Sequence, residues 1–290
     1  MERGKWKEES GKRKENSRMR RTLLLFVALL TSLSMMAQYD YLIANRKVIP
    51  GGYDFWVYTP EDYYFSQETT PVVIFLHGAS LCSKDLNRSR RYGPLDAIVK
   101  GREIPALVIV PQNPGGSWNP KKINDVLEWT LKNYPADSTR VYVLGMSLGG
   151  YGTLDFAGTY PEKVAAAMAL CGGTTLKDVQ GLGQVPLWIL HGTADKAVNI
   201  KESKKVVKAL EDAHNDKRLR YDWLKGQSHG ALARIFYMRR TYEWLFHHSL
   251  RDKERPLCGE YEITKDDLKG AYQDLDRDLP DPEVIDGNDE

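Results

Sequence analysis

Between residues 47 and 249 the chain alternates short apolar runs rich in Val and Ile with longer amphipathic stretches, and this alternation constrains the fold more than any other feature. Strands buried on both faces read as near-continuous apolar runs, whereas helices that cover a sheet repeat their apolar residues every three or four positions. The pattern therefore predicts an α/β fold with a doubly wound, mostly parallel sheet and helices on both faces. We expect strands at 53–58, 72–76, 106–110, 141–144, 164–170, 187–190 and 219–224, and the clearest helices at 121–133, 200–212 and 234–247.

The N-terminal end has a different composition from this central part. Residues 1–21 hold nine basic and four acidic side chains, an apolar run follows at 23–30, and the small residue Ala37 comes after it. Those are the three parts of a secretory signal, so residues 1–37 are predicted to be an N-terminal extension and signal peptide that is cleaved near Ala37. Met19 looks like a better start than Met1. A secreted or periplasmic protein without a membrane span in the mature chain is expected, with an uncleaved anchor or a buried helix as the alternative.

The C-terminal end loses the hydrophobic periodicity. Residues 251–290 hold six basic and fourteen acidic side chains, so we expect an acidic tail, solvated or laid over the α/β domain at 38–250. Asp274, Asp276 and Asp278 have the spacing that opens a calcium loop, but the Gly and Glu that such a loop needs are missing. The match is interpreted as chance.

Overall charge and cysteine content exclude several classes of protein. Forty-one Lys and Arg against 39 Asp and Glu give a net charge of +2, which provides no basic field for nucleic acid. Cys82, Cys171 and Cys258 lack the paired spacing of a zinc site or a disulfide framework. We therefore expect no metal, and cysteines that pack as small apolar groups, with one disulfide and a leftover thiol as the alternative.

The sequence GMSLGG at 145–150 is the first motif that indicates chemistry. It stands between the apolar run 141–144 and a helical stretch, so Ser147 is placed at the tip of a sharp strand–turn–helix connection that glycine neighbours permit. The hydroxyl of such a serine projects from the carboxyl edge of the sheet. This context predicts a nucleophile, and the alternative is an ordinary helix-capping serine.

A serine hydroxyl needs a base to take its proton, and the base needs a carboxylate to orient it. Asp195 follows the apolar run 187–190, and His229 lies in the loop before the last predicted helix. Both are expected at the same edge of the sheet as Ser147. Four rivals are set aside because of their local context: His214 in a charged loop, Asp178 with no strand before it, and His247 and His248, expected on the surface at the end of the last helix.

Two backbone N–H groups should face the oxyanion of a tetrahedral intermediate. Leu148, directly after Ser147, is expected to supply one. The loop HGAS at 77–80 follows a predicted strand and is expected to supply the other from Ala79, with Ser80 as second choice. A plain strand-ending turn is the alternative interpretation of this loop.

The order of Ser147, Asp195 and His229, together with the loop at 77–80, resembles the α/β-hydrolase superfamily over about residues 53–248. Within that superfamily, three stretches look like secreted bacterial carboxylesterases of the dienelactone-hydrolase-like group, which includes feruloyl-esterase-like enzymes and predicted peptidases; these are 91–94, 111–118 and 145–152. The resemblance implies ester hydrolysis through an acyl-enzyme with no cofactor. It also implies feruloyl or acetyl esters of plant polysaccharide as substrates. Dienelactone hydrolase itself has cysteine in place of Ser147, which puts lactone specificity in doubt.

Substrate-binding residues are harder to predict because loops whose shape is not encoded in a simple pattern set specificity. Gln112 and Trp118 lie in a loop at the same sheet edge, and Trp118 either stacks on a planar substrate group or covers the helix at 121–133. Arg88 and its neighbours Arg90 and Arg91 are expected in a solvated loop. A serine peptidase and a non-catalytic binding module on the same fold remain alternatives, and the oligomeric state is not indicated.

Overall fold

The computed structural model describes residues 41–61, 63, 66–275 and 281–287. The predicted signal peptide at 1–37 lies outside the described residues, as do Asp276 and Asp278. Within the described ranges, no helix combines the length and the apolar character needed to cross a lipid bilayer.

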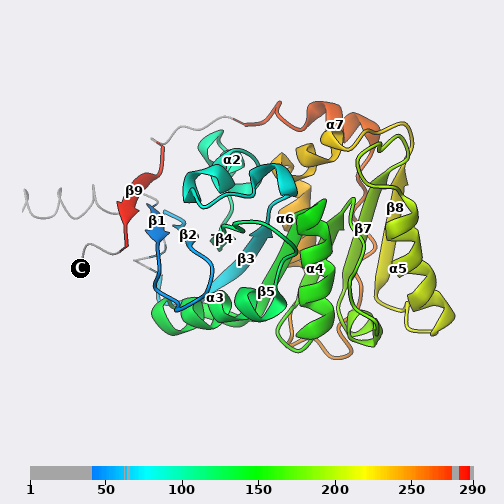
Figure 1. Ribbon diagram of the computed structural model, residues 1–290, viewed down its shortest axis with the longest axis horizontal. Coiled ribbons are helices and arrows are strands. Elements are labelled where there is room, and N and C mark those ends of the chain that lie inside the picture. The colour runs from blue at the N-terminus through cyan, green and yellow to red at the C-terminus, as the bar shows by residue number, and fades with distance from the viewer. Residues whose placement is uncertain (1–40, 62, 64–65, 276–280, 288–290) are drawn as a thin grey trace, which may run out of the picture. The chain divides into compact units, whose positions relative to one another are not determined.

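Nine strands of the described chain form one sheet in the order β8-β7-β6-β5-β3-β4-β2-β1-β9 (Figure 1). Strands β3 to β8 run parallel, β2 is antiparallel to β1 and β4, and β9 is parallel to β1. The carboxyl ends of the parallel strands therefore share one edge. The strands are β1 (Tyr41–Asn45), β2 (Phe55–Thr59), β3 (Thr70–Leu76), β4 (Leu107–Pro111), β5 (Ala136–Met146), β6 (Ala166–Leu170), β7 (Leu187–Gly192), β8 (Leu219–Leu224) and β9 (Glu283–Asp286).

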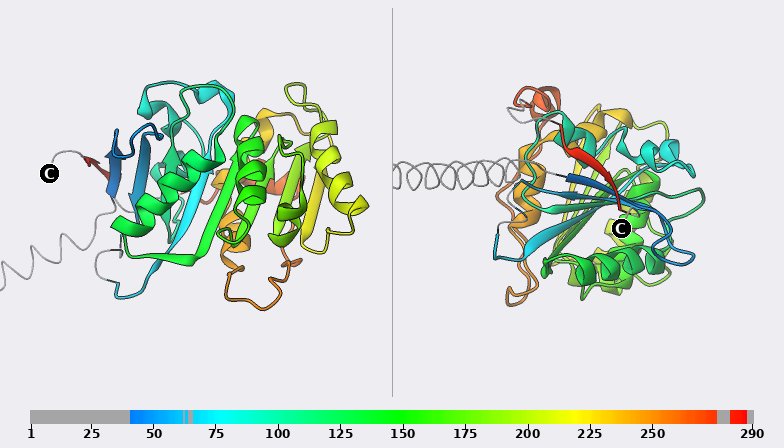
Figure 2. Two further views of the ribbon diagram at one scale, coloured as in Figure 1. Left: turned by 60° about the horizontal axis from the view of Figure 1, so that its bottom comes forward. Right: turned by 90° about the vertical axis from the view of Figure 1, so that its left-hand side faces the viewer.

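Helices cover both faces of the sheet. Figure 2 shows α3, α4 and α5 in front of the strands in its left view and helices on both sides of the sheet in its right view. The α-helices are α2 (Pro94–Val99), α3 (Pro120–Asn133), α4 (Leu148–Thr159), α5 (Lys201–Asp212), α6 (Arg239–Phe246) and α7 (Lys265–Gly270). Short 3-10 helices are η1 (Ala79–Leu81), η2 (Leu86–Arg90), η3 (Gln180–Gln184) and η4 (Gly230–Tyr237).

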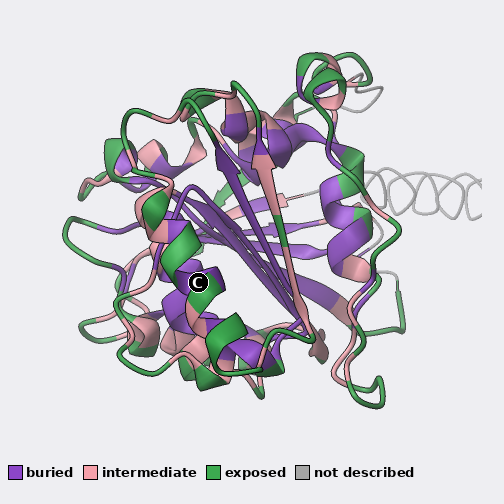
Figure 3. Cartoon of the chain, turned by 90° about the vertical axis from the view of Figure 1, so that its right-hand side faces the viewer, coloured by how far each residue is buried: buried purple, intermediate pink, exposed green. Residues whose placement is uncertain are grey.

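The alternation of side chains along each strand divides the core into two layers. On β3, Val73 and Phe75 pack with α2, η4 and α6, whereas Val72 and Ile74 pack with α3, α4 and α5. Figure 3 shows the inner strands of the sheet almost entirely buried between helices whose outer faces are exposed, with β8 at the near edge only partly buried. The prediction of a doubly wound, mostly parallel α/β sheet is confirmed.

The predicted elements differ from the structure in two places within the domain. The sequence did not predict β1, a short strand held by its pairing with β2. The single helix expected at 234–247 is wrong, because the chain is extended at Met238 (φ −88°, ψ 132°) and η4 ends before α6 begins. Side chains of α6 cap the end of η4: Thr241 Oγ1 donates to Ile235 O at 2.5 Å, and Tyr242 Oη donates to Phe236 O at 2.5 Å.

The C-terminal segment is also more ordered than a solvated tail. Its apolar residues Cys258, Ile263, Leu268 and Ala271 are buried against the face of the sheet that carries α6. The Trp244 Nε1 group donates to Cys258 O at 3.1 Å, which joins this segment to α6. Strand β9, in contrast, is exposed at all four residues. The residues after 250 are therefore in large part a layer of the α/β domain.

Candidate active site

Ser147 lies between β5 and α4 in a backbone conformation that residues other than glycine rarely adopt. Its φ is 60° and its ψ is −121°, and its side chain makes no capping hydrogen bond to α4. The alternative of a helix-capping serine is therefore not favoured. The Ser147 N–H donates to Leu170 O at 2.8 Å and ties the turn to the end of β6.

Two glycines of the GMSLGG motif are needed because backbones approach closely here. A Cβ on Gly149 would lie 1.7 Å from Leu76 O, and a Cβ on Gly145 would lie 2.6 Å from the same oxygen. Both distances are far inside van der Waals contact. The glycines thus let the first turn of α4 sit directly against the end of β3, which places Ser147 beside the loop that follows β3.

Asp195 and His229 are brought together from loops that follow neighbouring strands, β7 and β8. The His229 Nδ1 atom lies 2.7 Å from Asp195 Oδ2, and the His229 side chain is 24% exposed whereas that of Asp195 is 1% exposed. Asp195 Oδ1 accepts hydrogen bonds from Ala197 N–H at 2.8 Å and Val198 N–H at 2.9 Å. With a carboxylate at Nδ1, His229 carries its proton there and leaves Nε2 available as a base.

The environment of Asp195 favours its charged form. Burial raises the pKa of the Asp195 carboxyl, but hydrogen bonds from Val198 N–H, His229, the Cys171 thiol and Ala197 N–H outweigh burial, so the pKa lies below its ordinary value. Cys171 Sγ, at the end of β6, is within 4.8 Å of the Asp195 and His229 ligand atoms. Because Cys171 directly follows Leu170, this contact joins the Asp195–His229 pair to the strand end that holds Ser147.

The loop at 77–80 lies next to Ser147, as predicted for an oxyanion site. A Cβ on Gly78 would lie 3.4 Å from Ser147 Cβ. Ala79 is the first residue of η1 and Leu148 the first of α4, and N–H groups at a helix start have no acceptor within the helix. In the described chain, none of the backbone hydrogen bonds outside helices and strands uses either N–H.

Side chains that the sequence analysis missed hold this loop. The Gly78 N–H donates to Tyr92 Oη at 2.6 Å. His77 is fully buried, its Nδ1 lies 2.9 Å from Gly78 O, and its Nε2 accepts from Asn113 N–H at 3.1 Å. Burial lowers the pKa of His77 to about 4, so the ring is neutral and carries its proton on Nδ1. The stretch RYGP at 91–94 was a sequence signal for Tyr92, but its contact was not predictable.

Gln112 and Trp118 are buried and donate hydrogen bonds to backbone carbonyls of the segment that follows β3. Gln112 Nε2 donates to Leu81 O at 2.8 Å, and the residue is 3% exposed. Trp118 is also 3% exposed, donates its Nε1–H to His77 O at 3.1 Å, and packs edge-on against Tyr53. Of the two alternatives left open for Trp118, packing is therefore favoured over stacking on a substrate, because a ring buried this deeply presents no face to a ligand.

The rival residues lie elsewhere or are otherwise occupied. His248 is 2% exposed, which corrects the expectation of a surface residue; its Nδ1 contacts Trp244 O at 2.9 Å and its Nε2 accepts from Cys258 N–H at 3.1 Å. The Asp178 carboxylate accepts from Gln180 N–H at the start of η3. The cysteines Cys82, Cys171 and Cys258 are all unpaired.

Cys171, Asp195 and His229 are also the one group of three potential metal ligands found among the described residues. Burial raises the pKa of the Cys171 thiol, and so does its hydrogen bond to Asp195. Protonated donors on Cys171 and His229 thus satisfy the carboxylate between them. Hydrogen bonds from Cys171 and His229 to Asp195 therefore account for the closeness of the three side chains, and their chemistry gives no positive sign of a metal site.

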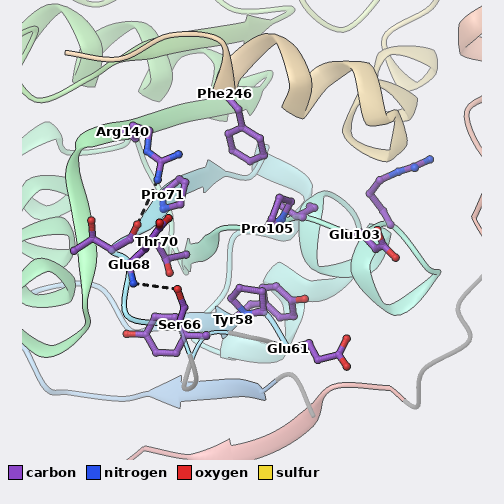
Figure 4. A pocket seen from close by; sticks show the side chains of 15 residues that line it. Tyr58, Glu61, Ser66, Glu68, Thr70, Pro71, Glu103, Pro105, Arg140 and Phe246 are labelled. Atoms are coloured by element: carbon purple, nitrogen blue, oxygen red, sulfur yellow. Dashed lines mark hydrogen bonds between the residues drawn. The ribbon is translucent and has the colours of Figure 1, made fainter. Parts of the chain in front are cut away.

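A cavity of about 640 Å³ lies at the other end of the sheet (Figure 4). It is lined by Tyr58, by Thr70 at the start of β3, by Arg140 and by Phe246, among others. The amino ends of the parallel strands meet here. The cavity contains none of the predicted site residues.

A doubly wound sheet with a strained serine between β5 and α4, and with an acid–histidine pair at the same edge, is the arrangement of the α/β-hydrolase fold. The chain has the α/β-hydrolase fold. Within it, residues 117–242 match the family described as Phospholipase/Carboxylesterase.

Individual relatives agree with this placement. Acetylxylan esterase A from Aspergillus awamori is 26% identical over 169 residues, which are 52% of this chain and 54% of the relative. The chain thus spans about half the length of the curated relatives it matches. The crystal structure of a thermostable esterase superposes with a TM-score of 0.61 at 25% identity and covers 74% of this chain and 64% of that chain. A mutant feruloyl esterase module from Clostridium thermocellum, complexed with sinapinate, has a TM-score of 0.55 at 16% identity, covers 74% of this chain and 91% of that chain, and shows the fold alone.

Proposed function

We propose that this protein is a serine carboxylic-ester hydrolase in which Ser147, Asp195 and His229 form a catalytic triad. The observation that carries the proposal is the convergence at one sheet edge of a serine at φ 60° and a histidine whose Nδ1 lies 2.7 Å from a buried carboxylate. The match to the Phospholipase/Carboxylesterase family over residues 117–242 supports the same reaction class.

In the proposed mechanism, Ser147 Oγ attacks the ester carbonyl carbon while His229 Nε2 takes the hydroxyl proton. Asp195 holds the Nδ1–H of His229 and stabilises the imidazolium that forms. The N–H groups of Leu148 and Ala79 donate to the oxyanion of the tetrahedral intermediate. His229 then protonates the departing alcohol, and an acyl-enzyme remains on Ser147. Water, activated by His229, releases the acid in a second step of the same kind.

The substrates that we propose are acetyl or feruloyl esters attached to plant polysaccharide. The acetylxylan esterase relative supports the first of these. Secretion or export to the periplasm fits a polymeric substrate, and the apolar run at 23–30 in the sequence supports it. N-terminal sequencing of exported protein tests this compartment, and a mature chain that begins after Ala37 is expected.

Covalent labelling tests the mechanism directly. A fluorophosphonate probe should label wild-type protein on Ser147, and Ser147→Ala should lose both the label and the hydrolysis of p-nitrophenyl acetate. Asp195→Asn should fold, because the amide is isosteric, and should lower kcat by about ten-thousandfold, as in the best-studied triad. A labelled cysteine, or an active Ser147→Ala protein, would overturn the proposal.

Substrate class needs a separate measurement. Acetylated xylan, methyl ferulate and a peptide amide panel are compared by kcat/KM, with Ser147→Ala as the blank for each. Release of acetate or ferulate above that blank is expected, and amide cleavage without ester cleavage would make the protein a peptidase. Binding of xylan without release of any product would indicate a binding module instead.

A further inference from the structure

His191 is a second histidine beside the Asp195 carboxylate, and the proposed mechanism does not use it. It lies in β7, four residues before Asp195, and is 0% exposed. His229, in contrast, comes from the loop after β8 and is partly exposed. The two rings therefore reach the same carboxylate from different elements.

The surroundings of His191 Nε2 decide where its proton lies. Nε2 is 3.0 Å from Val198 O and 3.3 Å from Asp195 Oδ2. A carbonyl oxygen and a carboxylate oxygen are acceptors only, so a bare ring nitrogen between them would leave three lone pairs facing one another in a buried place. The Nε2 atom therefore carries a proton and donates toward both oxygens.

The opposite side of the ring is fixed by α5. His191 Nδ1 lies 2.8 Å from Ser203 Oγ, which also lies 2.6 Å from Gly172 O. Ser203 has one hydroxyl proton for these two acceptors, and with the ring proton on Nε2 the hydroxyl donates to Nδ1. Gly172 follows Cys171, whose thiol is hydrogen-bonded to Asp195. The ring is thus held between α5, the end of β6 and the loop of Asp195, and its orientation toward the carboxylate is determined by packing on both sides.

We propose that His191 is a positioning residue that donates its Nε2–H to the Asp195 carboxylate and so limits the negative charge that Asp195 offers to His229. This inference rests on the proposed function of Asp195 and His229. At 3.3 Å the His191 contact is longer than the 2.7 Å contact of His229, so His229 remains the main partner of Oδ2. The thiol of Cys171 is a third side-chain donor to the same carboxylate, and a weaker one.

Removing this donor has a consequence for the pH dependence of the reaction. The titratable groups that act on His191 are Asp195 and His229, and Cys171 acts on Asp195. Burial lowers the pKa of His191, and the Val198 carbonyl and the Asp195 carboxylate oppose this only in part. Without the His191 donor, Asp195 attracts the proton on His229 more strongly, so His229 Nε2 becomes protonated at a higher pH.

Two substitutions separate donation from packing. In His191→Gln the amide nitrogen occupies about the position of imidazole Nε2 and still donates, whereas His191→Leu fills the space without a donor. We expect His191→Leu to lower kcat on p-nitrophenyl acetate by about ten- to a hundredfold, the range for loss of a hydrogen bond to a charged group, with KM nearly unchanged. We also expect the acid limb of its kcat/KM profile to move to higher pH, and His191→Gln to restore most of both.

His248→Leu is the matched control, because His248 is equally buried and hydrogen-bonded but belongs to the layer around α6. It should lower the melting temperature and leave the acid limb unmoved. Equal kcat and equal acid limbs in His191→Leu and His191→Gln would overturn the inference.

Nitrogen-15 NMR of wild-type protein gives a result even where His191→Leu fails to fold. The His191 Nε2 resonance should be that of a protonated nitrogen across the pH range of activity, and a bare Nε2 would overturn the inference. Failure of wild type to react with the fluorophosphonate would instead refute the proposed function, while the NMR result on the His191 proton would still stand.

Discussion

At the residue scale, the backbone of Ser147 stores strain that a variant can release. A residue with a Cβ held at φ 60° and ψ −121° costs about 1–3 kcal/mol relative to a relaxed conformation. Glycine adopts this conformation more easily. Ser147→Gly should therefore melt higher than Ser147→Ala, by about 2–4 °C for each kcal/mol of strain relieved, while both lack activity. Scanning calorimetry of the two inactive variants measures this, and a glycine variant that melts at or below the alanine variant would show an unstrained turn.

Asp195 links stability to pH. Its pKa is lower in the folded protein than in the unfolded chain, so the unfolded state binds more protons in the acid range. The carboxylate then contributes stability above its ordinary pKa of 3.8, and this contribution is lost as pH falls through the folded value. The difference in unfolding free energy between wild type and Asp195→Asn should shrink between about pH 5 and pH 3 in urea titrations. A difference that stays constant with pH would contradict the hydrogen bonds assigned to this carboxylate.

Several single residues were predictable because a motif names them. Ser147 is flanked by glycines, and Asp195 and His229 each follow an apolar run in a fixed order. His191 and Tyr92 were not predictable in the same way, because their partners are 4 and 14 positions away and depend on how loops fold. Trp118 shows the limit most clearly: the sequence placed it at the correct edge but left open whether its ring faces a substrate or the core.

At the element scale, the contact between α4 and β3 depends most closely on Gly149. A Cβ on Gly149 would overlap the carbonyl of Leu76, a backbone atom that cannot turn away. Overpacking in a core costs about 1–3 kcal/mol, and more where backbone must move. Gly149→Ala should therefore lose at least about 3 kcal/mol of unfolding free energy or fail to accumulate as soluble protein.

Gly259→Ala is the control for this substitution. A Cβ there meets no atom within 4 Å, and the residue has no positive φ. Its unfolding free energy in urea should stay within about 0.5 kcal/mol of wild type. A Gly149→Ala protein as stable as Gly259→Ala would show that α4 does not sit against the end of β3 as closely as the backbone geometry requires.

Elements with a strong apolar period were predictable, and those without one were not. All seven expected strands occur, and six of them are buried on both faces or nearly so, whereas β8 at the sheet edge is mostly half-buried. Strand β1 was missed because its apolar run, Leu42 to Ala44, is only three residues long, and β9 because its four residues are exposed. The separation of η4 from α6 depends on hydroxyl groups of Thr241 and Tyr242 that bond back to η4, which is a contact between residues and not a property of periodicity.

At the scale of the whole molecule, charge pattern and packing give different answers for the residues after 250. Composition suggested an acidic tail, either solvated or laid over the domain, since acidic side chains outnumber basic ones by fourteen to six. The apolar residues that pack are few and widely spaced, so no period marks them. Ile263, Leu268 and Ala271 nevertheless lie in one layer over α6 and η4. Sparse anchors of this kind are evident only once the surface that they cover is known.

This layer leads to a prediction for two truncations of different length. A chain that ends after residue 250 exposes the apolar face that Cys258, Ile263 and Leu268 cover, and burial of each such side chain is worth about 1.5–3 kcal/mol. We expect this protein to be insoluble or to melt well below full length. A chain that ends after residue 275 keeps the layer and loses only β9 and its neighbours, so it should melt near full length and hydrolyse p-nitrophenyl acetate at the same rate. Calorimetry and initial rates on both truncations measure this, and a stable, active protein that ends at residue 250 would show that the layer contributes nothing to the fold.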